Sequence, residues 1–134
     1  MSSNSSEAKM LDKKVESTIE MITRKPLFDE TCIFSIAARH LGDKWTLIIL
    51  VALMERTKRY GELQAQIPTI SPKMLVQTLK KLEQLELVER KIFPEVPPRV
   101  EYKLSKFGKE LRPMISLLCE WSIDNEKKLR KLEA

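Results

Sequence analysis

Four side chains suited to nucleic-acid contact recur at helical spacing after residue 71, with a fifth beside them: Lys73, Gln77, Lys80, Gln84 and Lys81. Lysine can bind phosphate groups or guanine, and glutamine can form two hydrogen bonds with adenine. Leucines at positions 75, 79 and 82 would fill the other side of the same helix. The pattern is typical of a recognition helix that enters a major groove. A solvated surface helix would show it too, so both interpretations stay open on this helix alone.

The positive charge of the chain is concentrated around this helix. Residues 71–112 contain ten Lys or Arg and six Asp or Glu, and so carry +4 of the net charge of +5. Such a basic segment is the electrostatic footprint of a nucleic-acid contact. We expect Arg99 to enter a minor groove or bind a phosphate, or alternatively to pair with a glutamate across strands. The residues expected to touch DNA are Ser71, Lys73, Gln77, Lys80, Lys81, Lys91 and Arg99.

The residue types argue against other chemistries. Two Cys and one His cannot form the usual four-ligand Cys/His zinc site, and three Gly leave no glycine-rich phosphate loop. No nucleophile is evident together with a base and an orienting group. We therefore expect that the chain is not an enzyme and binds no metal or cofactor. Cys32 and Cys119 do not suggest a disulfide framework, and no signal or membrane segment is evident. These features favour a cytoplasmic protein.

Apolar spacing predicts the elements that must position these groups. Helices are expected over residues 7–25, 32–41, 44–55, 60–66 and from 71 onwards, and a last long helix over 105–132 that bends at Pro113. Residues 88–93 and 99–104 are expected to be strands joined by a stiff proline-rich connector. Asp43, Ser71 and Ser105 are expected to cap the helices that follow them.

This order of helix, short helix, turn, helix and hairpin predicts a winged helix-turn-helix, a mainly α fold with a small β-hairpin wing. We assign residues 27–104 to a DNA-binding domain and expect residues 1–6 to be disordered. Residues 7–26 and 105–134 are expected to be dimerisation helices, because their apolar stripes need burial. The dimerisation residues would be Leu11, Val15, Ile19, Ile22, Leu118 and Trp121.

Several motifs resemble a known family. Residues 41–45 form Leu-Gly-Asp-Lys-Trp before an apolar helix, and residues 94–102 form Pro-Glu-Val-Pro-Pro-Arg-Val-Glu-Tyr. With the patterns at residues 59–63 and 67–71, they resemble the HxlR-type bacterial winged-helix regulators over residues 32–121. The resemblance implies a homodimeric DNA-binding transcriptional regulator. It also implies that the terminal helices form the dimer, the wing contacts DNA, and the helix after Ser71 enters the major groove.

The resemblance adds a hypothesis for Cys32. Some family members sense oxidants or electrophiles through a cysteine at this position, commonly followed by proline, whereas Ile33 follows here. Acidic residues just before Cys32 disfavour a thiolate, and a helix N-terminus would favour one. The sequence therefore leaves a redox sensor and a packed residue as alternatives.

The leading interpretation is a sequence-specific regulator that binds a double-stranded DNA operator as a homodimer, away from membranes. Repression is favoured over activation because no second domain for recruiting polymerase is evident. The alternative is a winged helix that serves as a protein-interaction module without specific DNA binding. The operator, the target genes and any small-molecule effector are not encoded in a form that can be interpreted.

Overall fold

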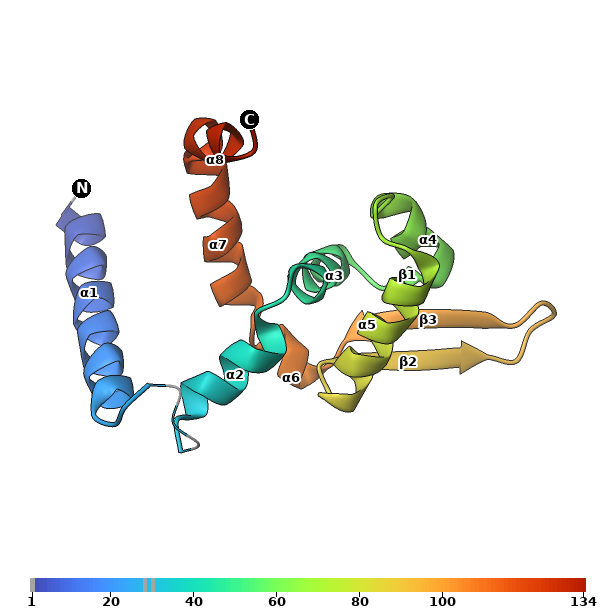
Figure 1. Cartoon of the computed structure of the whole chain (residues 1–134), viewed down its shortest axis with the longest axis horizontal. Helices are drawn as coiled ribbons and strands as arrows, with labels where there is room; N and C mark the ends of the chain where they lie inside the picture. Colours follow the sequence, from blue (N-terminus) through green and yellow to red (C-terminus); the bar gives the residue numbers. More distant parts are fainter. Residues whose placement is uncertain (1, 28, 30) are drawn as a thin grey trace. The chain divides into compact units, whose positions relative to one another are not determined.

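The structure, a computed structural model, describes residues 2–27, 29 and 31–134, in two units that cover residues 1–42 and 43–134. The first unit contains α1 (Ser2–Thr23) and α2 (Ile33–Leu41). The second unit, labelled in Figure 1, contains α3 (Lys44–Glu55), β1 (Lys58–Arg59), α4 (Tyr60–Gln66), α5 (Pro72–Gln84), β2 (Val88–Phe93), β3 (Arg99–Leu104), α6 (Lys106–Lys109), α7 (Arg112–Asp124) and α8 (Glu126–Leu132). These elements confirm the expected fold class, a mainly α winged helix-turn-helix with a β-hairpin wing.

Helix α1 carries an apolar stripe that is mostly exposed in the described part of the chain. Leu11, Val15 and Ile19 are 54, 51 and 56 % exposed, and Ile22 is half-buried. The helix begins at Ser2, so residues 2–6 are helical where disorder was expected. The segment contains neither proline nor glycine, the residues that most disfavour a helix. The helix ends at Thr23, shortly before Pro26, which cannot continue it.

The core of the second unit lies where α3, α4 and α5 meet the sheet. Buried side chains come from each of these elements: Ile49, Leu50, Leu53, Leu63, Leu75, Leu79, Leu82, Val88 and Leu104. Helix α7 adds Ile115. Burying a side chain of this size stabilises the fold by about 1.5–3 kcal/mol. The leucine spacing of α5 thus determines which face of that helix is buried in the core and which face stays exposed to solvent.

The sheet is antiparallel, with strand order β1-β3-β2. Strands β2 and β3 pair from Val88 with Leu104 to Phe93 with Arg99, and their ribbon projects away from the helices in Figure 1. This hairpin has the predicted bounds. Strand β1 was not predicted, because two residues are too short for any period of apolar residues to show.

Three helix N-termini are capped as predicted. The Asp43 carboxylate accepts a hydrogen bond from the backbone N–H of Thr46 at 2.9 Å. The Ser71 hydroxyl oxygen accepts a hydrogen bond from the backbone N–H of Met74 at 3.1 Å. The Ser105 hydroxyl oxygen accepts the N–H of Gly108 at 2.9 Å. Each bond satisfies a donor that the first helical turn would leave without a partner.

The predicted last helix is divided into α6, α7 and α8. Its first break lies at residues 110–111. Helix α7 then begins at Arg112, with Pro113 in its first turn, where a missing N–H costs nothing. The second break lies at Asn125 and was not predicted. There the side chain of Asn125 donates to the carbonyl oxygen of Trp121 at 2.8 Å, and the backbone N–H of Asn125 donates to the same oxygen at 3.1 Å.

Helix α6 is fastened to the turn that joins α5 to β2. The Ser105 hydroxyl donates to the carbonyl oxygen of Glu86 at 2.6 Å, and the Ser105 N–H donates to that of Leu87 at 3.0 Å. Glu86 has a φ of 61°, in the left-handed region. A Cβ atom on Gly108 would lie 2.1 Å from the carbonyl oxygen of Leu87, so glycine is required for this approach.

Candidate nucleic-acid interface

Helix α5 has one buried face and one polar face. Leu75, Leu79 and Leu82 are at most 2 % exposed and anchor the helix in the core. The polar residues that the sequence placed opposite them are all exposed: Lys73, Gln77, Lys80 and Gln84. The structure therefore brings these four side chains to one surface, where a helix can enter a major groove. Ser71, at the start of the helix, uses its oxygen as the N-cap and keeps its hydroxyl proton as a donor.

Lys81 lies beside this surface and holds α5 against the start of α3. Its Nζ lies 2.5 Å from Asp43 Oδ2 and donates to Thr46 Oγ1 at 3.1 Å. The lysine side chain is 34 % exposed and is held by two oxygens. The structure thus gives Lys81 a positioning contact within the protein, and a direct contact with DNA stays a prediction.

The same contacts change the ionisation of Asp43. Burial opposes ionisation, but hydrogen bonds from Lys81 and from the side chain and backbone of Thr46 outweigh it and lower the pKa of Asp43 to about 2. An unfolded aspartate has a pKa of about 3.9. The pair therefore stabilises the fold above about pH 4, and its contribution is lost as the pH falls towards 2. Solvent screens this pair, because the Asp43 side chain is 47 % exposed.

A second ion pair connects α5 to the wing. Arg90 Nε of β2 lies 3.2 Å from Glu83 Oε1 of α5. Both side chains are partly exposed, so the pair contributes little to stability. It does join the recognition helix to a strand of the hairpin, so the two candidate DNA-contacting elements are linked directly.

The wing holds Arg99 more tightly than the sequence predicted. Arg99 Nη1 lies 3.1 Å from Glu95 Oε1, and Arg99 Nε lies 3.3 Å from Glu101 Oε2. Its guanidinium carbon also lies 4.0 Å from the centre of the Phe93 ring, a cation–π contact. Arg99 therefore pairs with glutamates, but these lie in the connector and on its own strand β3, not across strands as the alternative expected. Contact of Arg99 with DNA stays a prediction. Lys91 is exposed on β2, with its Nζ 4.9 Å from the same ring.

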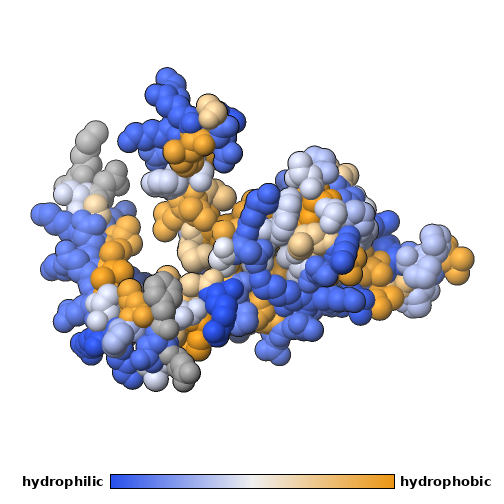
Figure 2. Space-filling view, viewed as in Figure 1, coloured by the Kyte–Doolittle hydropathy of each residue, from blue (hydrophilic) through white to orange (hydrophobic). Residues whose placement is uncertain are grey.

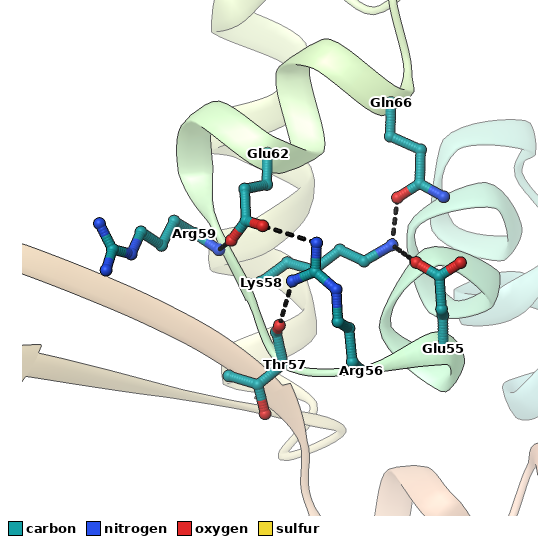
Figure 3. A network of polar contacts seen from close by, with 7 residues as sticks. All are labelled: Glu55, Arg56, Thr57, Lys58, Arg59, Glu62 and Gln66. Atoms are coloured by element: carbon teal, nitrogen blue, oxygen red, sulfur yellow. Dashed lines mark hydrogen bonds and ion pairs between the residues drawn. The ribbon is translucent and has the colours of Figure 1, made fainter.

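A polar network precedes α4 and fixes its position, as Figure 3 shows. Lys58 is only 2 % exposed, and its ammonium group lies 2.6 Å from Glu55 Oε1 and donates to Gln66 Oε1. A buried ammonium group is costly unless it is paired. Lys58 therefore belongs to the support of α4 and is not available for a ligand.

Arg59 is a candidate contact that sequence reasoning did not select. Glu62 pairs with Arg56 at 2.6 Å and accepts the backbone N–H of Arg59 at 3.0 Å. These contacts lower the pKa of Glu62 to about 2. The hydrogen bond from the Arg56 side chain has the larger effect, and the one from the Arg59 backbone has the next largest. In Figure 3 the Arg59 side chain points away from this network. It lines a hollow of about 390 Å³ that it shares with Glu95–Val100 of the wing.

The signal for Arg59 in the sequence is the basic cluster at residues 56–59, directly before a short helix. The cluster shows three positive charges, and only the structure separates their roles. Arg56 and Lys58 are paired with carboxylates, whereas Arg59 is exposed. We therefore add Arg59 to the candidate DNA contacts.

The expected dimerisation residues and Cys32 belong to other elements than α5 and the wing. Leu118 and Trp121 on α7 are 44 and 55 % exposed. Figure 2 shows hydrophobic side chains gathered over α7. Cys32 belongs to the first unit, at the N-cap position of α2, and is only 6 % exposed. The thiol of Cys32 is therefore shielded from solvent in this conformation.

Two kinds of site are not found in the described ranges. Among residues 2–27, 29 and 31–134, no group of three or more His, Cys, Asp or Glu is arranged to hold a metal ion. Over the same residues, no helix has both the length and the apolar content needed to cross a bilayer.

The family model for HxlR-like helix-turn-helix proteins matches residues 40–130. The uncharacterized HTH-type transcriptional regulator YkvN of Bacillus subtilis is 43% identical over 91 residues, which are 68% of this chain and 77% of YkvN. A second relative, an uncharacterized HTH-type transcriptional regulator of Methanothermobacter thermautotrophicus, is 41% identical over 90 residues, covering 67% of this chain and 69% of its own.

Two solved structures share the fold. A crystal structure assigned to a MarR-family transcriptional regulator from Porphyromonas gingivalis W83 is 40% identical, with a TM-score of 0.71, covering 75% of this chain and 99% of that chain. The redox regulator HypR in its oxidized form is 33% identical, with a TM-score of 0.68, covering 70% of this chain and 97% of that chain.

Proposed function

The chain belongs to the HxlR-like helix-turn-helix family of transcriptional regulators, and from this premise we propose that it binds a specific double-stranded DNA site as a homodimer and represses transcription there. The observation that carries the proposal is the polar face of α5, with Lys73, Gln77 and Lys80 exposed together on a helix whose other face is buried.

The contacts around α5 support this use. Buried leucines and the Lys81–Asp43 pair hold the helix in place, so its polar face is ordered before DNA arrives. Lys73 and Gln77 lie in its N-terminal half, the part of a recognition helix that contacts base edges. Lys80, Lys91 and Arg59 are exposed cations that can bind phosphates of the DNA backbone beside the groove.

Gln77 is expected to provide sequence preference. Its amide can donate to and accept from one adenine, so Gln77→Ala should relax preference at one base pair by about 1–3 kcal/mol. The measurement is selection of bound duplexes from a random pool, followed by affinities for single-base variants of the selected site.

Gln84→Ala is the matched control for Gln77→Ala. It removes the same amide from the last residue of the same helix, and Gln84 is also exposed. We expect it to change the preference less than Gln77→Ala does, because the N-terminal part of a recognition helix contacts the base edges. If Gln77→Ala weakened binding to all duplexes equally, α5 would be docked in a different way.

The dimer is proposed from the exposed apolar faces of α1 and α7. Replacing Val15 and Ile19 with Lys should shift the chain from dimer to monomer in sedimentation equilibrium, because two charges would enter the interface. Ser17→Lys with Glu20→Lys places the same residue type on the opposite face of α1 and should leave a dimer. A dimer that persists in the first variant would contradict the role of α1.

We also propose that Cys32 makes DNA binding sensitive to oxidants. The likeness to the redox regulator HypR supports the idea, and because Cys32 is only 6 % exposed, its thiol must become accessible before it can react. With diamide as oxidant, two Cys32 thiols of a dimer would form one disulfide and transfer two electrons and two protons to diamide.

The Cys32 proposal is tested by measuring DNA affinity before and after diamide. Wild type and Cys119→Ser should lose at least about tenfold in affinity, equivalent to 1.4 kcal/mol, and Cys32→Ser should lose none. Equal affinity of oxidised and reduced wild type would leave Cys32 as a packed residue only.

A further inference from the structure

A pocket of about 200 Å³ lies between the end of α3, the base of β3 and the start of α7. Leu53 and Leu104, 4 and 5 % exposed, form an apolar floor. The remaining lining residues are Met54, Arg56, Thr57, Lys103, Lys109 and Arg112. An adjoining hollow of about 370 Å³ shares Met54, Lys109 and Arg112 with it, and adds Pro113 and Ser116. The two hollows thus form one concave region.

The rim of this pocket is positively charged and contains no carboxylate. Arg56 is balanced by Glu62 at 2.6 Å, and Lys103 lies 3.6 Å from Glu89. Lys109 and Arg112 form no ion pair within 4 Å among the residues that the structure describes. In the part of the chain that the structure describes, the pocket thus has two cations outside any ion pair and an apolar floor.

The pocket is separate from the elements assigned to DNA reading. None of its residues belongs to α5 or β2, and it contains none of the candidate DNA contacts. Its β3 residues, Lys103 and Leu104, lie at the opposite end of that strand from Arg99. The charge on this rim is thus not explained by the proposed interface.

We propose that this pocket binds a small organic anion, a carboxylate attached to a compact apolar body. The apolar body would cover Leu53, Met54 and Leu104 and leave water. The carboxylate would meet Arg112, whose guanidinium fork matches it through two hydrogen bonds, and Lys109. The proposal concerns binding alone and holds whether or not α5 reads DNA.

The test is an NMR titration of the ¹⁵N-labelled full chain with sodium benzoate at constant ionic strength. Benzoate should cause saturable amide shifts confined to residues 53–57 and 103–116, at concentrations up to about 20 mM, a range suited to a weak millimolar site. Benzamide lacks the charge and inorganic phosphate lacks the apolar body. Each should bind at least about fivefold more weakly than benzoate.

Matched charge variants locate the site. The double variant Lys109→Gln with Arg112→Gln should weaken benzoate at least about fivefold. Lys127→Gln with Lys128→Gln removes the same charge from α8 and should leave the affinity unchanged. Both variants must keep the wild-type spectrum outside the substituted positions. Shifts without saturation, or an equal effect of both variants, would overturn the proposal in favour of diffuse counterion binding. Phosphate binding as tightly as benzoate would overturn the organic-anion assignment.

Discussion

Raising the salt concentration from about 50 to about 200 mM is expected to weaken DNA binding by roughly 10³–10⁵-fold, for a dimer that contacts about six to ten phosphates. Cations that touch phosphates release the counterions condensed on DNA, and added salt opposes this release. In each chain of the proposed dimer, exposed cations near the interface include Lys73, Lys80, Lys91 and Arg59. The measurement is fluorescence anisotropy of a labelled duplex over a series of KCl concentrations.

One charge variant makes this prediction specific to α5. Lys80→Gln should reduce the slope of log affinity against log salt by about 1.8, because a dimer loses two phosphate contacts of about 0.9 each. Lys127→Gln on α8 removes the same charge away from α5 and should leave the slope unchanged. An affinity that does not respond to salt would favour the alternative of a protein-interaction module.

Gly108→Ala is expected to destabilise the second unit by about 3 kcal/mol or more. The added Cβ would lie 2.1 Å from the carbonyl oxygen of Leu87, a backbone atom that cannot rotate away. Moving α6 would stretch the bonds from Ser105 to Glu86 and Leu87, at 2.6 and 3.0 Å. The loss should appear as a lower midpoint in urea-induced unfolding followed by circular dichroism.

Gly61→Ala is the control for the effect of Gly108→Ala. Gly61 is also helical, in α4, but a Cβ atom there would meet nothing within 4 Å. Alanine favours a helix over glycine by up to about 1 kcal/mol, so stability should stay equal or rise. If both variants unfolded at the same urea concentration, the close approach at Gly108 would not constrain the fold.

Much of the fold follows from local patterns in the sequence. The leucine spacing of α5 and the alternation in β3 identify these elements, because each period reflects which side chains face the core. Asp43, Ser71 and Ser105 were predictable as N-caps, since a cap bonds to a backbone group only three residues away. The polar face of α5 was predictable for the same reason: positions on one helix fix which side chains share a surface.

Tertiary structure decided what the charged side chains do. Lys81 is 38 residues from Asp43 in sequence, and no local pattern predicts that they meet. Arg56, Lys58 and Arg59 look alike in the sequence, but the fold buries one, pairs another and exposes the third. The spacing of charged residues in the sequence does not show which oxygens they will meet. The role of each charged side chain depends on which oxygens the packed elements bring within a few ångströms of it. The amino-acid sequence therefore shows by itself that α5 has a basic face. Only the tertiary structure shows which cations remain available for a ligand.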